Sequence, residues 1–482
     1  MMVLGGRKLF GTGIVYMTLA LGINIAQATD ASIKEPWAEK TIELDASSPV
    51  PKGILSNDAF EALRKKGEAL FTARFTETDG AGRPNATQAI LPTKARSAAQ
   101  NRFARTSGPD AAACSSCHND PVVGGAGDFV TNVFVSEGFS NADFDSTDPQ
   151  FSNERGTNHL FGAGLIELLA REMSFDLAQL RDDVLAEAAK SGSPATIDLV
   201  TKGVSFGQLT AMSDGLLDVS AIEGVDDDLI IRPFSQKGVM TSLRQFTINA
   251  LNHHHGMQAV ERFGARWTGE TDFDEDGKPD EMGEGDISAL VAWQAELPAP
   301  SQIVPVESNW QEAAKKGAEL FSDFGCDSCH VQSLPLKSLA FQDPGPFDVS
   351  GTLNITSSDK AAMYDLSFRA WTSSLKRNEE GEILVPLFGD LKRHKMTDQR
   401  NEQLGNELLS QRFVDRNIFL TSELWGVAST APYGHRNDFT TLDGIIRAHG
   451  GDAAKSAGNY ENTNDSERSA LIAFLKTLVI RP

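Results

Sequence analysis

Cysteine is scarce in this sequence, which limits the ways in which the fold can be cross-linked. The 482 residues contain four cysteines, and all four lie in two pentapeptides, CSSCH (114–118) and CDSCH (326–330). No cysteine remains for a structural disulfide outside these segments. The two pentapeptides are therefore the first candidates for a functional site.

Basic residues are also fewer than acidic ones. The chain has 44 lysines and arginines against 66 acidic residues, a formal net charge of -22. Nucleic acids and anionic membrane surfaces repel so acidic a protein. We therefore expect no nucleic-acid partner, and a soluble protein partner that is basic or neutral.

Long apolar runs are absent beyond the N-terminus, so we expect no later segment to cross a bilayer. The first residues, 1–28, contain Arg7 and Lys8, then a mostly apolar stretch (9–25), then the sequence AQA (26–28). This pattern is typical of a secretory signal peptide that is cleaved at its end, and an uncleaved anchor is the alternative. The mature protein is predicted to be periplasmic or secreted, without integral membrane contact.

Two pairs of similar segments indicate that one helical unit occurs twice. KKGEALF (65–71) and SALVAWQAEL (288–297) resemble KKGAELF (315–321) and SALIAFLKTL (469–478). The closing segment of each pair has apolar residues at helical spacing, and each pair encloses one pentapeptide. An opening helix, a C-x-x-C-H motif and a closing helix, in this order, are typical of a cytochrome c domain.

A Pro-rich segment without periodicity, LPAPSQIVPVES (297–308), separates the two units. It divides the mature chain into a first domain (29–300) and a second domain (301–482), as the length also favours. The first domain carries a polar insertion at 72–113 and further insertions after its pentapeptide. We predict a mainly α fold of two cytochrome c-like domains with long loop insertions, especially in the first.

The pentapeptides predict two covalently bound haem c groups. C-x-x-C-H holds two thiols one helical turn apart, where they can form thioethers with the haem vinyl groups, while the histidine binds the iron. His118 and His330 are the predicted iron ligands. The predicted thioether-forming residues are Cys114, Cys117, Cys326 and Cys329.

Three other interpretations of the motif are weaker. A zinc ribbon needs its two C-x-x-C pairs close in sequence, whereas Cys117 and Cys326 lie far apart in the chain. A thioredoxin-like redox pair needs a βαβ setting, which the flanking segments lack. A pair of disulfides would not explain the histidine that follows each motif.

His449 is the predicted second ligand of the second haem iron. It follows a helical run in TTLDGIIRAHGGD (440–452) and would approach the iron from the face opposite His330. Six-coordinate iron suits electron transfer. His435 is an alternative ligand, or it lines the haem edge together with Tyr433. A surface histidine is the plainer interpretation of His449.

Three consecutive histidines (253–255) look like a metal cluster. Neighbouring residues of a helix point about 100 degrees apart, so we do not expect the three side chains to converge on one ion. The apolar face of residues 243–251 continues to His254, which is predicted to lie near the first haem as a candidate catalytic residue. A core histidine with two solvated neighbours is the alternative. The histidines and methionine left without a role are His159, His394 and Met396.

An acidic loop (271–286) has the D-x-D-x-D-G spacing of a calcium site. The candidate ligands are Asp272, Asp274, Asp276 and Asp280. The loop departs from an EF-hand at position twelve, where Gly283 stands in place of glutamate. Bound Ca²⁺ is therefore a hypothesis, and a solvated acidic loop is the alternative.

Four segments carry a family resemblance: SGPDAAACSSCHNDPVVGGAGD (107–128), HLFGAGLIE (159–167), DLKRHKM (390–396) and LWGVASTAPYGHRNDFTTLDGIIRAHGGDA (424–453). They resemble the bacterial di-haem oxidoreductases, also called thiol oxidoreductases, which are distant relatives of the di-haem cytochrome c peroxidases. In those peroxidases a ligand of the second haem follows fourteen residues after the histidine of a P-Y-x-H motif. The resemblance therefore assigns that ligand to His449, where peroxidases commonly carry Met, and implies a lower potential for this haem.

The sequence also departs from this family pattern. Relatives often have an aromatic residue, usually Trp, near RPFSQKG (232–238), where this chain has Gln236. The distal histidine of the peroxidases has no counterpart, and the resemblance offers Glu167 as the counterpart of their catalytic glutamate. The resemblance therefore implies membership of the family more than peroxidase activity.

Together these features predict an enzyme, a periplasmic di-haem oxidoreductase of the peroxidase type. The second haem (His330, His449) would relay electrons from a soluble redox protein. The first haem (His118), without an obvious sixth ligand, would bind peroxide or dioxygen. Two alternatives stay open: a non-catalytic electron-transfer protein with both irons six-coordinate, and a di-haem dioxygenase that cleaves an organic substrate.

Overall fold

The computed structural model describes residues 39, 42–82, 85–86, 95–96, 111–135, 152–348, 361–398, 404 and 414–481. The predicted signal peptide lies outside these residues, so its presence and cleavage stay a prediction. Within the described part of the chain, no helix is both long and apolar enough to span a bilayer.

The described residues form helices of one to eight turns and many short strands. The helices are α1 (Asn57–Thr72), α2 (Ala163–Ser191), α3 (Leu243–Ala250), α4 (Val260–Phe263), α5 (Ala265–Thr268), α6 (Glu284–Ala295), α7 (Ser308–Asp323), α8 (Leu442–Arg447), α9 (Ala454–Glu461) and α10 (Asp465–Leu475). The strands are β1 (Gly53–Ile54), β2 (Asn85–Ala86), β3 (Ala95–Arg96), β4 (Gly127–Val135), β5 (Ser152–Thr157), β6 (Ala195–Thr201), β7 (Val204–Ala211), β8 (Leu217–Asp218), β9 (Ser301–Gln302), β10 (Leu334–Leu336), β11 (Ala340–Asp343), β12 (Ala362–Asp365), β13 (Ile383–Val385), β14 (Arg393–Lys395), β15 (Ile418–Leu420) and β16 (Leu478–Val479).

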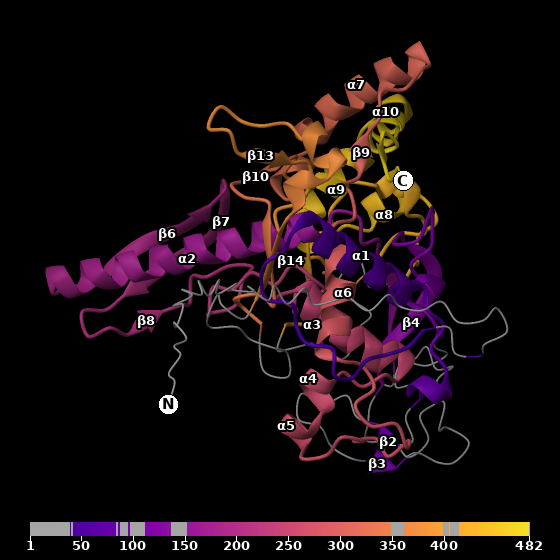
Figure 1. Cartoon of the computed structure of the whole chain (residues 1–482). Coiled ribbons are helices and arrows are strands. Elements are labelled where there is room, and N and C mark those ends of the chain that lie inside the picture. Colours follow the sequence, from indigo (N-terminus) through magenta and orange to yellow (C-terminus); the bar gives the residue numbers. More distant parts are fainter. Residues whose placement is uncertain are drawn as a thin grey trace, which may run out of the picture.

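The repeated segments form two helix pairs. Helix α1 packs against α6, and α7 packs against α10 (Figure 1). Gly67 of α1 and Gly317 of α7 occupy matching places at the two crossings. A Cβ atom on either glycine would overlap a carbonyl oxygen of the partner helix, that of Ala289 or that of Ala470. Both crossings therefore need a residue without a side chain, because the two backbones approach so closely.

Each helix pair also contacts the histidine of its pentapeptide. The ring of Phe71, in α1, lies 6.0 Å from the ring of His118 between centroids. The ring of Phe321, in α7, lies 6.5 Å from that of His330. The two pairs thus hold the two histidines in equivalent places.

An arm extends from the rest of the molecule on the left of Figure 1. It consists of the 29-residue helix α2 and the antiparallel sheet β6–β7–β8, which packs along the helix. In β7, Val204 and Phe206 are buried on either side of exposed Ser205, and Leu209 and Ala211 are buried on either side of Thr210. This is the pattern of a strand with one covered face, here the face toward α2.

The larger apolar core crosses the predicted domain boundary. It joins Leu169 and Leu290 of the first unit to Phe341 and Val385, which follow the second pentapeptide. Strand β1 also pairs in parallel with β12. A smaller core surrounds α7 and α10. Residues that follow the second pentapeptide therefore pack on the first unit, and the division into 29–300 and 301–482 stays a prediction.

The prediction of a mainly α fold is wrong. The structure is 39% helical and 17% strand, and the strands form several small sheets. Antiparallel pairs such as β4–β5 and β6–β7 lie in segments that the sequence analysis treated as loop insertions. Their backbone groups are satisfied by local pairing, and register irregularities in both pairs interrupt the alternation that would mark a strand in the sequence.

Candidate functional site

Each pentapeptide forms one short helical turn. The backbone N–H of His118 donates to the carbonyl oxygen of Cys114 over 3.1 Å, and that of His330 donates to Cys326 over 3.0 Å. All four cysteines are free thiols. Each turn therefore presents two thiols and one imidazole on the wall of a cavity.

The second cavity, of about 290 Å³, brings His330 and His449 face to face. Both line it together with Cys326 and Cys329. The two imidazole rings lie 6.5 Å apart between centroids, with 57° between their planes. The sequence predicts that His449 approaches from the face opposite His330, and in the structure the two rings lie on opposite sides of one space.

Carbonyl groups determine which nitrogen each ring presents to the cavity. Nδ1 of His330 lies 3.2 Å from the oxygen of Phe388, and Nδ1 of His449 lies 2.8 Å from the oxygen of Ile445. A carbonyl oxygen only accepts, so Nδ1 carries the proton in both rings and Nε2 keeps its lone pair. Burial lowers the pKa of both histidines, that of His330 to about 4, so both are neutral near pH 7. Neutral imidazoles with a free Nε2 are suited to bind a metal.

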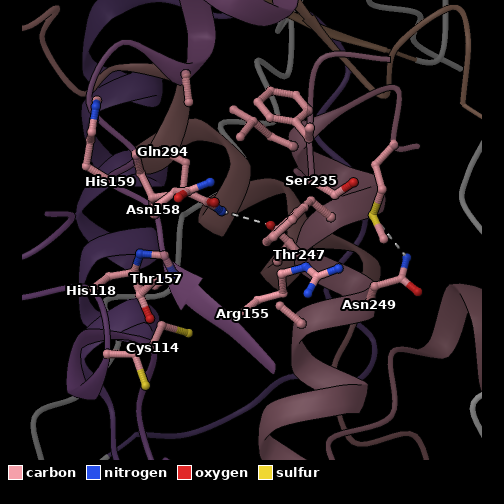
Figure 2. Close-up of a pocket in the computed structure, with 18 of the residues that line it drawn as sticks. Cys114, His118, Arg155, Thr157, Asn158, His159, Ser235, Thr247, Asn249 and Gln294 are labelled. Atoms are coloured by element: carbon pink, nitrogen blue, oxygen red, sulfur yellow. Dashed lines mark hydrogen bonds between the residues drawn. The ribbon is translucent and has the colours of Figure 1, made fainter. Parts of the chain in front are cut away.

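The first cavity, of about 440 Å³, is larger and lies beside His118. Nδ1 of His118 lies 3.3 Å from the carbonyl oxygen of Gly125, and burial lowers the pKa of this histidine to about 4. Figure 2 shows Ser235, Thr247 and Asn249 across the cavity from His118. In the described part of the chain, no imidazole is paired with His118 as His449 is with His330.

The histidine triplet lies in a π-helical turn, Leu251–His255, rather than in a regular α-helix. All three side chains line the first cavity. His255 donates from Nδ1 to the carbonyl oxygen of Ala111 over 2.6 Å, and its Nε2 lies 3.5 Å from Sγ of Cys114. Burial lowers the pKa of His254 to about 3, and nearby His255 and His118 add to the shift. The sequence favoured His254 as the one closest to the first pentapeptide's site, and the wider π-turn brings His253 and His255 to the same cavity as well.

The remaining histidines line the second cavity. His435 stacks on Phe419 with 3.6 Å between ring centroids and does not face His330. His394 pairs through Nε2 with a carboxylate oxygen of Asp390 over 2.7 Å. Burial lowers the pKa of His394, but its hydrogen bonds to Asp390 and Cys329 outweigh burial and raise it to about 10. Met396 and Tyr433 line the same cavity.

Glu167 lines neither cavity. Its carboxylate accepts from the backbone N–H of Leu243 at the start of α3, over 2.8 Å, and pairs with Arg171 on its own helix. The side chain is 1% exposed. The geometry therefore makes Glu167 a packing residue of α2 and α3 and does not bring it to a reaction site.

The acidic loop gathers three of its four predicted calcium ligands. Carboxylate oxygens of Asp272, Asp274 and Asp276 all lie within 4.8 Å of one another. Asp280 is not in this group. Glu281, which the sequence analysis missed, is buried, and its pKa is raised well above the usual value by burial and then by Asp274.

One wall separates the two cavities and belongs to both. We call it the shared wall, and its residues are Thr157, Asn158, His159, Ile166, Gln236, Leu420, Thr421, Ser422 and Glu423. His159, which had no predicted role, donates from Nε2 to the carbonyl oxygen of Trp425 over 3.2 Å. Glu423 was missed, because an isolated glutamate before LWG has no motif around it.

Comparison with solved structures finds distant similarities to the following two proteins. Hydrazine synthase of Kuenenia stuttgartiensis is 13% identical with a TM-score of 0.37, over 97% of this chain and 100% of that one. A MauG-like protein associated with microbial copper homeostasis is 16% identical with a TM-score of 0.28, over 56% of this chain and 78% of that one. No protein-family profile and no curated protein sequence matches the chain. Both structural similarities are distant.

Proposed function

We propose that this protein is an exported di-haem c-type cytochrome with oxidoreductase activity of the peroxidase type. The observation that carries the proposal is the pair of imidazoles, His330 and His449, that face each other beside Cys326 and Cys329. The second pentapeptide thus supplies two thiols and one ligand, and a distant segment supplies the other ligand.

The spacing of this pair fits a haem iron. Two metal–imidazole bonds of about 2.0 Å each would hold two rings roughly as far apart as these are. Nδ1 of each ring is bonded to a carbonyl oxygen, which leaves Nε2 as the nitrogen that can bind a metal. Cys326 and Cys329 would attach the haem, whose iron would supply one-electron redox chemistry.

The difference between the two cavities supports separate roles for them, one in binding the oxidant and the other in electron transfer. His118, Cys114 and Cys117 offer the same attachment chemistry on the wall of the larger cavity. The labelled side chains across from His118 in Figure 2 are the hydroxyl groups of Ser235 and Thr247, the amide of Asn249 and the guanidinium of Arg155, all of which can hydrogen-bond a small oxidant. We propose that peroxide binds in the first cavity and that electrons from a soluble redox protein enter through the second.

We also propose that the acidic loop binds Ca²⁺. Asp272, Asp274 and Asp276 bring their carboxylates together as an oxygen-ligand site requires. Buried Glu281 would complete the site in place of the absent glutamate at position twelve. The role of the ion would be to hold the segment that leads into α6.

Spectroscopy of the purified holoprotein tests the main proposal. Two haems per chain, one high-spin and one low-spin, with peroxide consumption at the expense of a reduced donor, are the expected results. Two low-spin haems that bind neither cyanide nor carbon monoxide would identify an electron carrier instead. Oxygen uptake with an oxidised carbon product and no need for peroxide would identify a dioxygenase.

A further inference from the structure

The shared wall holds several buried polar atoms that lack a hydrogen-bond partner among the described residues. They are Nδ1 of His159, Oε1 of Gln236 and Oε1 of Glu423. All three side chains line both cavities. Buried polar atoms are rarely left unbonded in folded proteins, so a group of three in one wall needs an explanation.

The partners that these side chains do have determine what the unbonded atoms can accept or donate. Nε2 of His159 donates to the carbonyl oxygen of Trp425, so its Nδ1 carries a lone pair. The side-chain amide of Gln236 donates to the carbonyl oxygen of His435 over 3.1 Å, so Oε1 is free to accept. Two of the three side chains in the wall are therefore acceptors, and they can only be satisfied by a group that brings a proton.

Hydroxyl and amide groups of this wall can donate a hydrogen bond, but Glu423 is its carboxylic acid and can give the proton up. Burial raises the pKa of its carboxyl to about 7, and the nearby charge of Asp390 adds to the shift. The carboxyl is therefore partly protonated near neutral pH, and the acidic form donates while the ionised form accepts. A carboxylic acid with a pKa close to the working pH is well suited to proton transfer.

The backbone around Glu423 holds the side chain in place. The N–H of Thr421 donates to the oxygen of Lys392 over 3.1 Å, and the N–H of Leu424 donates to that of Phe388 over 3.3 Å. The carbonyl oxygen of Phe388 also accepts from Nδ1 of His330, so these bonds join the segment to the backbone that orients the imidazole of the second cavity. Glu423 is thus placed by the same backbone that shapes the second cavity, while its side chain also borders the first.

We propose that Glu423 is a proton-transfer residue that serves both cavities, with His159 and Gln236 as the polar groups along its path. The inference rests on the proposed function. Reduction of hydrogen peroxide consumes two electrons and two protons, breaks the O–O bond and forms two water molecules. The donor protein supplies the electrons through the second cavity, and Glu423 delivers protons one at a time to the peroxide oxygens in the first, directly or through a bridging water. Solvent returns each proton to its carboxylate.

Among the described residues, Asp390 is the charged group that shifts the pKa of Glu423, and histidines line both cavities. Asp390 raises the pKa of Glu423, and Asp390 is itself paired with His394. His159, in the same wall, is neutral because burial lowers its pKa to about 4. Arg155 lines the first cavity only. A pH effect that disappears on changing Glu423 alone therefore belongs to that carboxyl.

Two substitutions of Glu423 test the proposal on the haem-loaded protein. Glu423→Gln keeps the shape but cannot release a proton, and Glu423→Asp keeps the acid. Infrared difference spectra of oxidised against reduced protein should show a carboxylic acid band that is lost in Glu423→Gln and shifted in Glu423→Asp. Peroxide turnover should fall about 100-fold or more in Glu423→Gln, the usual range for loss of a proton-transfer group, and recover in part in Glu423→Asp.

Glu296→Gln is the matched control. Burial also raises the pKa of Glu296 to about 7, but this residue lines neither cavity and pairs with Arg64 and Arg369. Its substitution should leave both the band and the turnover as in the parent protein. Haem content and absorption spectra measured on every variant separate a misfolded protein from one that lacks proton transfer.

The outcomes divide cleanly between the two proposals. Normal turnover in Glu423→Gln together with an unchanged infrared band would overturn the role of Glu423. If the parent protein fails to reduce peroxide at all, the proposed function falls, and the infrared band alone then decides on Glu423. Loss of the band in Glu423→Gln would support proton exchange at this residue, and its retention would refute it.

Discussion

His449 faces His330 across the second cavity, with 6.5 Å between their ring centroids. His435 lies on the wall of the same cavity but stacks on Phe419 instead. The two predicted ligands of the second iron therefore differ in what their rings face, since His449 faces His330 and His435 stacks on Phe419. Their substitution should have different effects.

Replacement of His449 is expected to change the spin state of one haem. His449→Ala removes the sixth ligand and should convert a low-spin haem to high-spin, while His449→Met should keep it low-spin and raise its potential. Resonance Raman spectra and redox titration measure both effects. His435→Leu is the control and should keep the low-spin signal. A spin change in His435→Leu but not in His449→Ala would reverse the assignment.

The close crossing of α1 and α6 makes Gly67 sensitive to any side chain. Gly67→Ala should lower the free energy of unfolding by about 1–3 kcal/mol, the usual cost of overpacking, because the new Cβ overlaps the backbone of Ala289. Urea unfolding measures the loss. Gly458→Ala is the control, since a Cβ there meets nothing within 4 Å and the residue lies inside α9. It should be neutral or stabilise the protein by up to about 1 kcal/mol. Equal losses in both variants would contradict the close crossing.

Calcium is expected to stabilise the protein. An ion present at about 100 times its Kd adds about 2.7 kcal/mol to the free energy of unfolding. Tm should therefore rise on addition of Ca²⁺ and fall again with a chelator, and Asp274→Asn should abolish the response. Asp227→Asn, an exposed aspartate outside the loop, should respond like the parent protein. If addition of Ca²⁺ leaves the Tm of the parent protein unchanged, the proposed calcium site is wrong.

The buried carboxyl of Glu423 is expected to make stability depend on pH. Its pKa is raised from the usual 4.5 to about 7 in the folded protein, so between these values the folded state binds more protons than the unfolded state. Stability should therefore fall as pH rises from 4.5 through 7. Glu423→Gln should remove this part of the pH dependence of the free energy of unfolding, which urea unfolding at several pH values measures. The control Glu296→Asp keeps an acid and should retain the pH dependence of the parent protein. A parallel slope in Glu423→Gln and the parent protein would show that the carboxyl titrates normally.

Features that depend on spacing along the chain could be predicted. Apolar residues at helical intervals and the two pairs of similar segments predicted the opening and closing helices, and the pentapeptides predicted two sites with thiols and imidazole on one side. Glu167 shows the limit of a resemblance. The position of Glu167 in a matching segment does not reveal its hydrogen bonds. In the structure its carboxylate accepts from the backbone N–H of Leu243 and pairs with Arg171.

The sequence by itself determined the two C-x-x-C-H turns and the helices beside them, because these depend on contacts between residues a few positions apart. Only the tertiary structure decided which side chains meet between the two cavities. His159, Gln236 and Glu423 come from distant parts of the chain and share no motif. They meet because the packing of α2, the segment before α3 and the segment before α8 brings them into one wall, and such packing leaves no local periodicity to read.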